Sequence, residues 1–269
     1  MHRQNPDVLI VKERGFIMQL TPEMFLIVCP FLFLAGFVDA IAGGGGLISL
    51  PAYLLVGLPP HYAIGTNKLS SSCGTLVATL RFLKSGMVLF KVALPSVAAA
   101  IAGSAIGSHL SLSVDEQTLR YVLFVILPVS AFFVLNKNMF SDKGKKEAAA
   151  DTRTIVTAVA SAFLIGIYDG FYGPGTGTFL IIAFTVFAHM NVPTANAQAK
   201  VINLTTNITA LVVFILNGQV LFMLGAATAA CNILGNYLGS GLAISKGSAI
   251  ARPVIIGVLI LLLIKVLTG

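Results

Sequence analysis

The chain has 269 residues, of which 57% are hydrophobic and only 10% are charged, and its mean hydropathy is +0.92. A water-soluble domain of this size carries more charge, so the composition excludes most soluble classes and predicts an all-α polytopic membrane protein in contact with a lipid bilayer. The 17 Lys and Arg residues outnumber the 10 Asp and Glu residues. On so apolar a chain this surplus indicates cytoplasmic loops, and nucleic acid is not an expected partner.

A polar N-terminal tail, residues 1–23, precedes the first apolar stretch. Residues 1–17 carry several charged side chains without a long apolar core, so no cleavable signal peptide is predicted, and Met18 is predicted as the native start. The 3 Cys and 4 His residues of the chain are scattered, and we expect neither a metal site nor a cofactor.

Apolar stretches then follow along the chain, at residues 24–42, 47–58, 63–83, 87–110, 118–135, 154–172, 178–190, 194–216, 220–244 and 252–267. The second stretch of each half is short. At about 1.5 Å per helical residue it cannot cross a hydrocarbon core of about 30 Å, so it is predicted as one arm of a broken or re-entrant helix. With each broken helix counted as one segment, the chain has about eight membrane segments, four in each half.

A polar linker at residues 137–153 separates two similar halves, 24–136 and 154–269. An offset of 132 residues superposes a lysine, an arginine and several glycines, namely Lys68 on Lys200, Arg120 on Arg252, Gly86 on Gly218, Gly103 on Gly235 and Gly107 on Gly239. Earlier in the halves the offset is 130, and it matches Asp39 to Asp169, Gly43 to Gly173 and Gly45 to Gly175. Such constant offsets predict two homologous four-segment repeats.

Asp39 and Asp169 are the acidic residues that stand inside apolar segments, whereas the other acids stand in tails or loops. An ionised carboxylate at membrane depth is costly, so such a group is usually functional or paired inside the bundle. We therefore predict that both residues take part in proton coupling. The alternative is that each one caps the amide end of a half-helix.

A glycine-rich break follows each of these acids, formed by Gly43, Gly44, Gly45 and Gly46 in the first half and by Gly173, Pro174, Gly175, Thr176, Gly177 and Thr178 in the second. Non-helical backbone at membrane depth is tolerated where it is buried in protein or lines a polar cavity. The amides of the following helix would then face an anion. We predict Gly43, Gly44, Gly45, Gly46, Gly173, Gly175 and Thr176 as substrate-binding residues. Close packing by small residues is the alternative, and it fits Gly103 with Gly107 and Gly235 with Gly239 better.

The next span of each half begins with polar side chains. These are Thr66, Asn67, Lys68, Ser70, Ser71 and Ser72 in the first half and Gln198, Lys200, Asn203, Thr205, Thr206 and Asn207 in the second. A single lysine near the end of a span can extend to the membrane surface. Beside amides, hydroxyls and a glycine break, the repeated lysine instead predicts a site for a small anion. The candidate ligands are Thr66, Asn67, Lys68, Gln198, Lys200 and Asn203.

Together these motifs resemble the TauE/SafE sulfite exporter family. The likeness covers almost all of residues 24–267, and its most specific parts are Gly36 to Gly46 with Asp39, Gly65-Thr66-Asn67-Lys68, Asp169-Gly170-Phe171 and Gly173-Pro174-Gly175. The resemblance implies a multi-pass secondary transporter of the bacterial inner membrane for sulfite, sulfonates or related organic acids. With the embedded acids, it predicts proton coupling and alternating access; a homodimer and a monomer are both left open. Relatives often carry a small residue where Asp169 stands.

Two alternatives to a transporter remain. A passive anion channel would use the same broken helices, and concentrative flux would distinguish it from a carrier. An intramembrane aspartyl protease also needs two embedded acids, but Asp39 follows Gly36-Phe37-Val38 and lacks the Gly-x-Gly-Asp context typical of such enzymes. An enzymatic activity is therefore not expected.

The positive charges predict the topology. Arg81, Lys84 and Lys91 are separated from the linker 137–153 by two spans, so both loops lie on one face, and their charges make that face cytoplasmic. If each broken helix is re-entrant, the repeats are inverted and Lys246 is also cytoplasmic. If the broken helix crosses the membrane, the repeats are parallel.

Overall fold

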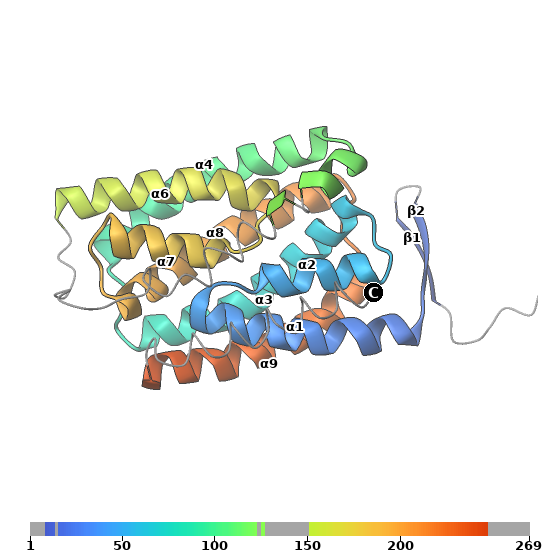
Figure 1. Cartoon of the computed structure of the whole chain (residues 1–269), viewed down its shortest axis with the longest axis horizontal. Helices are drawn as coiled ribbons and strands as arrows, with labels where there is room; N and C mark the ends of the chain where they lie inside the picture. Colours follow the sequence, from blue (N-terminus) through green and yellow to red (C-terminus); the bar gives the residue numbers. More distant parts are fainter. Residues whose placement is uncertain (1–8, 14–15, 123–124, 127–150, 247–269) are drawn as a thin grey trace, which may run out of the picture.

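The computed structural model describes residues 9–13, 16–122, 125–126 and 151–246. In chain order the elements are β1 (Leu9–Glu13), β2 (Phe16–Leu20), α1 (Pro22–Ala42), α2 (Gly46–Leu55), α3 (Pro60–Lys84), α4 (Phe90–Ser113), α6 (Thr152–Phe171), α7 (Thr176–Val186), α8 (Val192–Leu216) and α9 (Phe222–Lys246). The helices lie roughly along one axis and form a bundle (Figure 1). Of the predicted segments, 118–135 lies mostly and 252–267 wholly outside the described residues, as does most of the linker 137–153.

The chain is an α-helical membrane protein. Four of the described helices, α1, α4, α6 and α8, are long and apolar enough to cross a membrane. The short stretches predicted in each half are the apolar helices α2 and α7, of 10 and 11 residues. At about 1.5 Å per residue they reach only about half of the hydrocarbon core.

Helix starts and ends follow local sequence signals. The side chain of Asp151 accepts a hydrogen bond from Thr154 N at 2.8 Å and so caps α6. Hydrogen bonds from the side chain and the backbone of Thr154 lower the pKa of the exposed Asp151 carboxyl below its usual value. Asn191 caps α8 in the same way. Gly43 ends α1 in the left-handed conformation, with φ of 80°, which glycine adopts without steric cost.

Each broken helix folds back on itself. In Figure 1, α2 runs back from the end of α1 toward the start of α3, and α7 runs back in the same manner from the end of α6. The two hairpins enter the bundle from opposite ends, because α1 starts beside the strands and α6 starts at the far end of the molecule. Their tips are the glycine-rich breaks.

The long helices α3 and α8 run in opposite directions. Where α3 ends and α4 begins, Gln198 near the start of α8 donates a hydrogen bond to Leu89 O at 2.9 Å. At the other end, the Thr66 hydroxyl near the start of α3 accepts a hydrogen bond from Leu221 N, beyond the end of α8, at 3.0 Å. At each end of the bundle, one of these two helices therefore begins and the other ends.

Glycines bring two helix pairs into backbone contact. A Cβ on Gly103 or Gly107 of α4 would overlap the α6 backbone at Phe163 and Ile167. A Cβ on Gly235 or Gly239 of α9 would likewise overlap the α1 backbone. The close packing predicted for these four glycines is confirmed.

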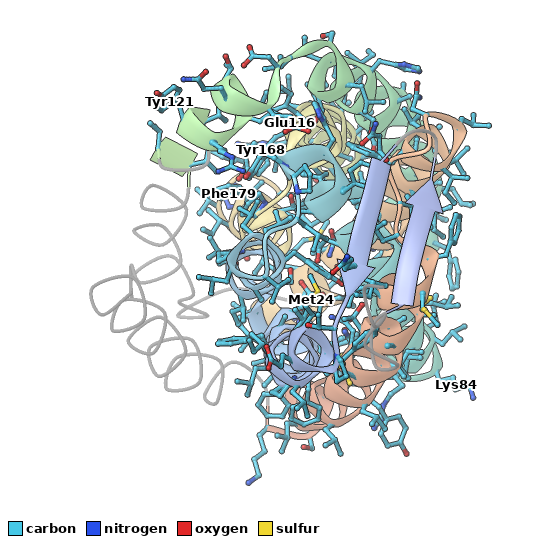
Figure 2. The ribbon with its side chains drawn as sticks, turned by 90° about the vertical axis from the view of Figure 1, so that its right-hand side faces the viewer. Met24, Lys84, Glu116, Tyr121, Tyr168 and Phe179 are labelled. Atoms are coloured by element: carbon cyan, nitrogen blue, oxygen red, sulfur yellow. The ribbon has the colours of Figure 1, made fainter. Side chains whose placement is uncertain are left out.

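The N-terminal tail contains structure that the sequence did not predict. β1 and β2 pair as an antiparallel sheet in which Leu9 stands opposite Leu20, and the predicted start Met18 lies within β2. The fold is therefore not helical throughout. A strand is predicted from alternating hydrophobic and polar residues, and this tail with mixed charges has no strong alternation. Its sequence therefore did not predict the two paired strands. Figure 2 looks along the helices, with the two strands in front of the bundle.

Candidate functional site

The two glycine-rich breaks meet inside the bundle. The amide of Thr178 donates a hydrogen bond to Gly43 O at 3.3 Å, and the Thr178 hydroxyl donates one to Ala42 O at 2.8 Å. A Cβ on Gly46 would lie 3.0 Å from the Cα of Pro174. The tips of the two helical hairpins are thus packed backbone to backbone, which only glycine permits at Gly43.

Two helices present polar faces to the breaks. On α3 this face carries Lys68, Ser71 and Thr75, which are spaced i, i+3 and i+7 and so lie on one side of the helix. Lys200, Asn203 and Asn207 repeat this spacing on α8. The two helices therefore turn matching polar faces toward the breaks.

The embedded acids and lysines form two ion pairs, and each pair joins the two halves of the chain. Lys68 Nζ lies 2.9 Å from Asp169 Oδ2, and Lys200 Nζ lies 2.8 Å from Asp39 Oδ2. All four residues are buried. Because an unpaired charge in this environment is costly, each lysine neutralises the acid that it contacts.

The second partners of the acids differ. Lys200 Nζ also donates a hydrogen bond to the backbone oxygen of Asp39. Asp169 Oδ1 accepts a hydrogen bond from the Thr176 hydroxyl at 2.7 Å. In the described contacts both carboxylates are held by side chains, whereas the capping alternative required helix amides.

Several amides of the breaks are already used within them. Ile48 N donates to Gly45 O at 3.0 Å, and Thr176 N donates to Gly173 O at 3.2 Å. These amides are therefore occupied in this conformation, and side chains supply most of the polar groups that face the space between the breaks.

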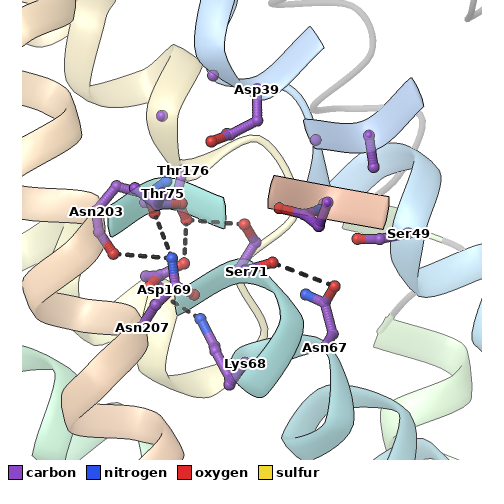
Figure 3. A pocket seen from close by; sticks show the side chains of 17 residues that line it. Asp39, Ser49, Asn67, Lys68, Ser71, Thr75, Asp169, Thr176, Asn203 and Asn207 are labelled. Carbon is purple, nitrogen blue, oxygen red and sulfur yellow. Dashed lines mark hydrogen bonds and ion pairs between the residues drawn. The ribbon is translucent and has the colours of Figure 1, made fainter. Parts of the chain in front are cut away.

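A small polar cavity lies where the breaks, α3, α8 and α9 meet (Figure 3). The residues that line it are mostly polar or glycine: Ala35, Asp39, Gly43, Gly45, Gly46, Ser49, Asn67, Lys68, Ser71, Thr75, Asp169, Gly173, Thr176, Gly177, Asn203, Asn207 and Asn232. The space between them is about 20 Å³, which is close to what one buried water molecule requires. The Ser49 hydroxyl is buried, and in the described part of the chain it has no hydrogen-bond partner.

Most of the predicted site residues line this cavity, namely Asp39, Gly43, Gly45, Gly46, Asn67, Lys68, Asp169, Gly173, Thr176 and Asn203. Five others lie outside its lining, namely Gly44, Thr66, Gly175, Gln198 and Lys200. Thr66 and Gln198 instead bind the backbone of neighbouring turns, and Gly175 begins α7 in the left-handed conformation. Lys200 contacts Asp39 from outside the cavity.

Seven lining residues were not among the predicted site residues, namely Ala35, Ser49, Ser71, Thr75, Gly177, Asn207 and Asn232. Ser71, Gly177 and Asn207 belong to the polar and glycine-rich motifs named above, and Ala35 is an ordinary small residue of an apolar helix. Thr75 could have been found, because the offset of 132 places it on Asn207 and it shares a helix face with Lys68. Asn232 is an amide within an apolar stretch, with Asn236 one helical turn further along, and has no polar match in the first half, which is a weaker signal. Nothing in the sequence around Ser49 distinguishes it from an ordinary small residue of a short helix.

The chain resembles membrane transporters over nearly its whole length. A family model described as Sulfite exporter TauE/SafE matches residues 28–266. A probable membrane transporter protein of Haemophilus influenzae is 38% identical over 225 residues, which cover 83% of this chain and 87% of the relative. No solved structure matches the chain.

Two further relatives carry similar names. The probable membrane transporter protein ORF9 of a Sinorhizobium species is 37% identical over 244 residues, covering 90% of this chain and 91% of the relative. The probable membrane transporter protein YfcA of Escherichia coli K12 is 34% identical over 224 residues, covering 83% and 82%. The chain therefore belongs to the TauE/SafE sulfite exporter family of membrane transporters.

Proposed function

We propose that this protein is a secondary transporter of the bacterial inner membrane that carries small anions, such as sulfite or sulfonates, in exchange with or together with protons. The observation that supports this most strongly is the pair of buried lysines, each neutralised by an acid of the other half, beside a polar cavity between two broken helices. Broken helices that meet at a central site are typical of secondary transporters.

Anion binding follows from the chemistry of the lining. Lysine, amide and hydroxyl groups can all donate hydrogen bonds to the oxygens of a small oxyanion. The carboxylates compete for the same lysines as internal counterions. An entering anion must therefore displace a carboxylate, and uptake of a proton by that carboxylate keeps the buried site close to neutral.

We further propose that the two halves are inverted repeats. In support, helix lengths correspond closely, with 21, 10, 25 and 24 residues in α1 to α4 and 20, 11, 25 and 25 residues in α6 to α9. The equivalent helices α3 and α8 run in opposite directions, as do α1 and α6 (Figure 1). Inversion allows the two halves to exchange conformations and so to open the site to either side in turn.

Inverted repeats predict that equivalent turns face opposite sides of the membrane. Ser85 and Asn217 are exposed residues at the ends of α3 and α8 and are related by the offset of 132. In a variant lacking Cys29, Cys73 and Cys231, we expect a membrane-impermeant maleimide to label Asn217→Cys in intact cells. Ser85→Cys should react only after the cells are permeabilised, because the positive charges beside it are cytoplasmic. Labelling of both sites from the same side would contradict inversion.

A protease is poorly supported by the geometry. Aspartyl proteases use two carboxylates that share one proton, which requires the acids to face each other. Here Asp39 and Asp169 each contact a lysine instead. A channel would share this architecture with a carrier, so flux measurements have to separate the two.

The proposed function is tested by flux in liposomes containing the purified protein. With an imposed pH gradient, we expect sulfite or methanesulfonate to accumulate above its equilibrium concentration and to be released when a protonophore is added. Protein-free liposomes and liposomes with a Lys68→Ala variant are the controls, and the variant should lose most of the flux because it lacks the cation that lines the cavity. Equilibration without accumulation would identify a channel. No flux of any sulfur oxyanion or carboxylate would refute the anion assignment.

A further inference from the structure

We infer that the two ion pairs have different tasks: Lys68–Asp169 is the pair that separates when an anion and a proton bind, and Lys200–Asp39 is a permanent clamp. The exchange role of Lys68–Asp169 rests on the proposed function. The clamp role of Lys200–Asp39 concerns folding and does not depend on that function. The sequence treats the pairs as equivalent, because Asp39 matches Asp169 and Lys68 matches Lys200 in the two halves.

The backbone around Asp39, at the end of α1, is hydrogen-bonded to the second half of the chain. The carbonyl groups of residues 39–43, at the end of α1, all accept hydrogen bonds from α7 or α8. The donors are Lys200 for residue 39, the Asn196 amide for residues 40 and 41, and the Thr178 hydroxyl and amide for residues 42 and 43. A lysine at the C-terminal end of a helix also interacts favourably with the helix dipole. Lys200 thus joins a network that docks the whole end of α1.

The Asp169 side has no such network among the described residues. Carbonyls of the second break are bonded within their own half, where Gly173 O accepts from the Thr176 amide and Pro174 O accepts from the Tyr168 hydroxyl. Lys68 contacts the Asp169 side chain, and no hydrogen bond from Lys68 to the α6 backbone is found in the described part of the molecule. Separating this pair therefore breaks one ion pair and leaves the helix end intact.

Access to the cavity follows the same division. Both carboxylates line the cavity and both lysines are almost completely buried, but only Lys68 of the two lysines lines the cavity. The buried Ser49 hydroxyl also lines this space and has no partner in the described residues, so it can donate a hydrogen bond to a bound anion. Figure 3 shows Lys68 and Asp169 together with the amides of Asn203 and Asn207. An anion that enters the cavity can reach Lys68 but not Lys200.

Other charged groups do not alter this balance. Lys200 is neutralised by Asp39, His61 at the start of α3 contacts Ser111 O and Glu116, and Lys91 and His109 of α4 and Arg153 of α6 are exposed. The Tyr168 hydroxyl donates a hydrogen bond to Pro174 O, and α7 contains no titratable side chain. When a monovalent anion takes the place of the Asp169 carboxylate at Lys68, uptake of one proton by Asp169 restores neutrality. The expected stoichiometry is therefore one proton for each monovalent anion.

The test is calorimetric titration of the purified protein with methanesulfonate, which stays a monovalent anion across the working pH range. Titration in buffers of different ionisation enthalpy counts the protons taken up. For the wild-type protein we expect one proton per anion, and over the pH range in which this proton is taken up the affinity should fall about tenfold per pH unit. Asp169→Asn should bind without proton uptake and without this pH dependence. Asp39 also lines the cavity, so Asp39→Asn is judged by its proton count and not by its affinity. Anion binding to this variant should still be accompanied by the uptake of one proton.

Thermal unfolding with and without methanesulfonate supplies the second measurement. Each Asn variant leaves a buried lysine without its counterion. Saturating methanesulfonate should return the Tm of Asp169→Asn close to that of the wild type, because the anion can replace the missing carboxylate. It should not restore Asp39→Asn, because Lys200 is closed off from the cavity.

The outcomes separate the inference from the function. Loss of proton uptake in Asp39→Asn with retention in Asp169→Asn would reverse the assignment, and equal effects of both variants would refute the division of tasks. If the wild-type protein binds neither methanesulfonate nor sulfite, the proposed function fails and the exchange role of Lys68–Asp169 fails with it. The Tm values still test the clamp role of Lys200–Asp39 in that case. A clamp requires Asp39→Asn to be less stable than Asp169→Asn.

Discussion

Alanine at Gly43 is expected to abolish folding of the transporter, whereas alanine at the adjacent Gly44 is expected to be tolerated. Gly43 has φ of 80°, and a Cβ there would overlap the backbone of Gly177 and Thr178 in the opposite break. The left-handed conformation alone costs a residue with a side chain about 1–2 kcal/mol, and the overlap cannot be relieved by moving a flexible side chain. The two hairpin tips would have to separate.

Gly44 is a matched control because it lies in the same break. A Cβ there would meet Val38 Cγ1 at 3.7 Å and the Thr178 hydroxyl at 3.8 Å, which are ordinary contact distances. Fluorescence-detected gel filtration of tagged variants would measure the yield of monodisperse protein, and thermal unfolding would measure its stability. A Gly43→Ala variant as abundant and as stable as Gly44→Ala would show that the breaks do not pack in this way.

Lys200→Met is expected to destabilise the protein by about 3–5 kcal/mol, because it leaves the Asp39 carboxylate buried without a counterion and removes a hydrogen-bond donor to the end of α1. For a chain of this size, such a loss corresponds to a fall in Tm of about 6–20 °C. Methionine retains most of the length and apolar contact of the lysine side chain. The loss can therefore be assigned to the charge and its hydrogen bonds.

A double variant provides the control. Lys200→Met combined with Asp39→Asn removes both charges, so it should recover part of the Tm lost in the single variant. The remaining deficit would measure the hydrogen bonds of the lysine to the helix end. If the double variant were less stable than Lys200→Met alone, the buried charge of Asp39 could not be the cause of the instability.

The comparison of sequence and structure is most informative at the four buried charges. Their position in the apolar segments and their repetition predicted a proton-coupling role for the acids and an anion site for the lysines, and the structure joins the four residues in two buried ion pairs. Which lysine contacts which acid was not predictable. Since the halves are similar, Asp39 has the same sequence relationship to the lysine of its own half as Asp169 has to its own. The crossed pairing follows from how the halves face each other.

The sequence also could not predict which of the candidate binding residues line the cavity. A polar residue in an apolar helix predicts a buried or functional position, but Thr66 and Gln198 satisfy neighbouring backbone groups while Ser71 and Thr75 reach the cavity. These residues differ in the direction of the side chain relative to the packed neighbours. That direction depends on helix rotation, which is set by contacts between distant segments.

The sequence by itself determined the membrane character of the chain, its apolar helices, the two short helices and the positions of the breaks, because each of these depends on the composition of a single stretch. Only the tertiary structure decided that the hairpin tips meet, that the ion pairs cross between the halves and that Lys68 lines the cavity while Lys200 clamps the end of α1. Those features depend on contacts between the faces of helices that are distant in the sequence. Two lysines in equivalent sequence positions can therefore have different surroundings and different roles.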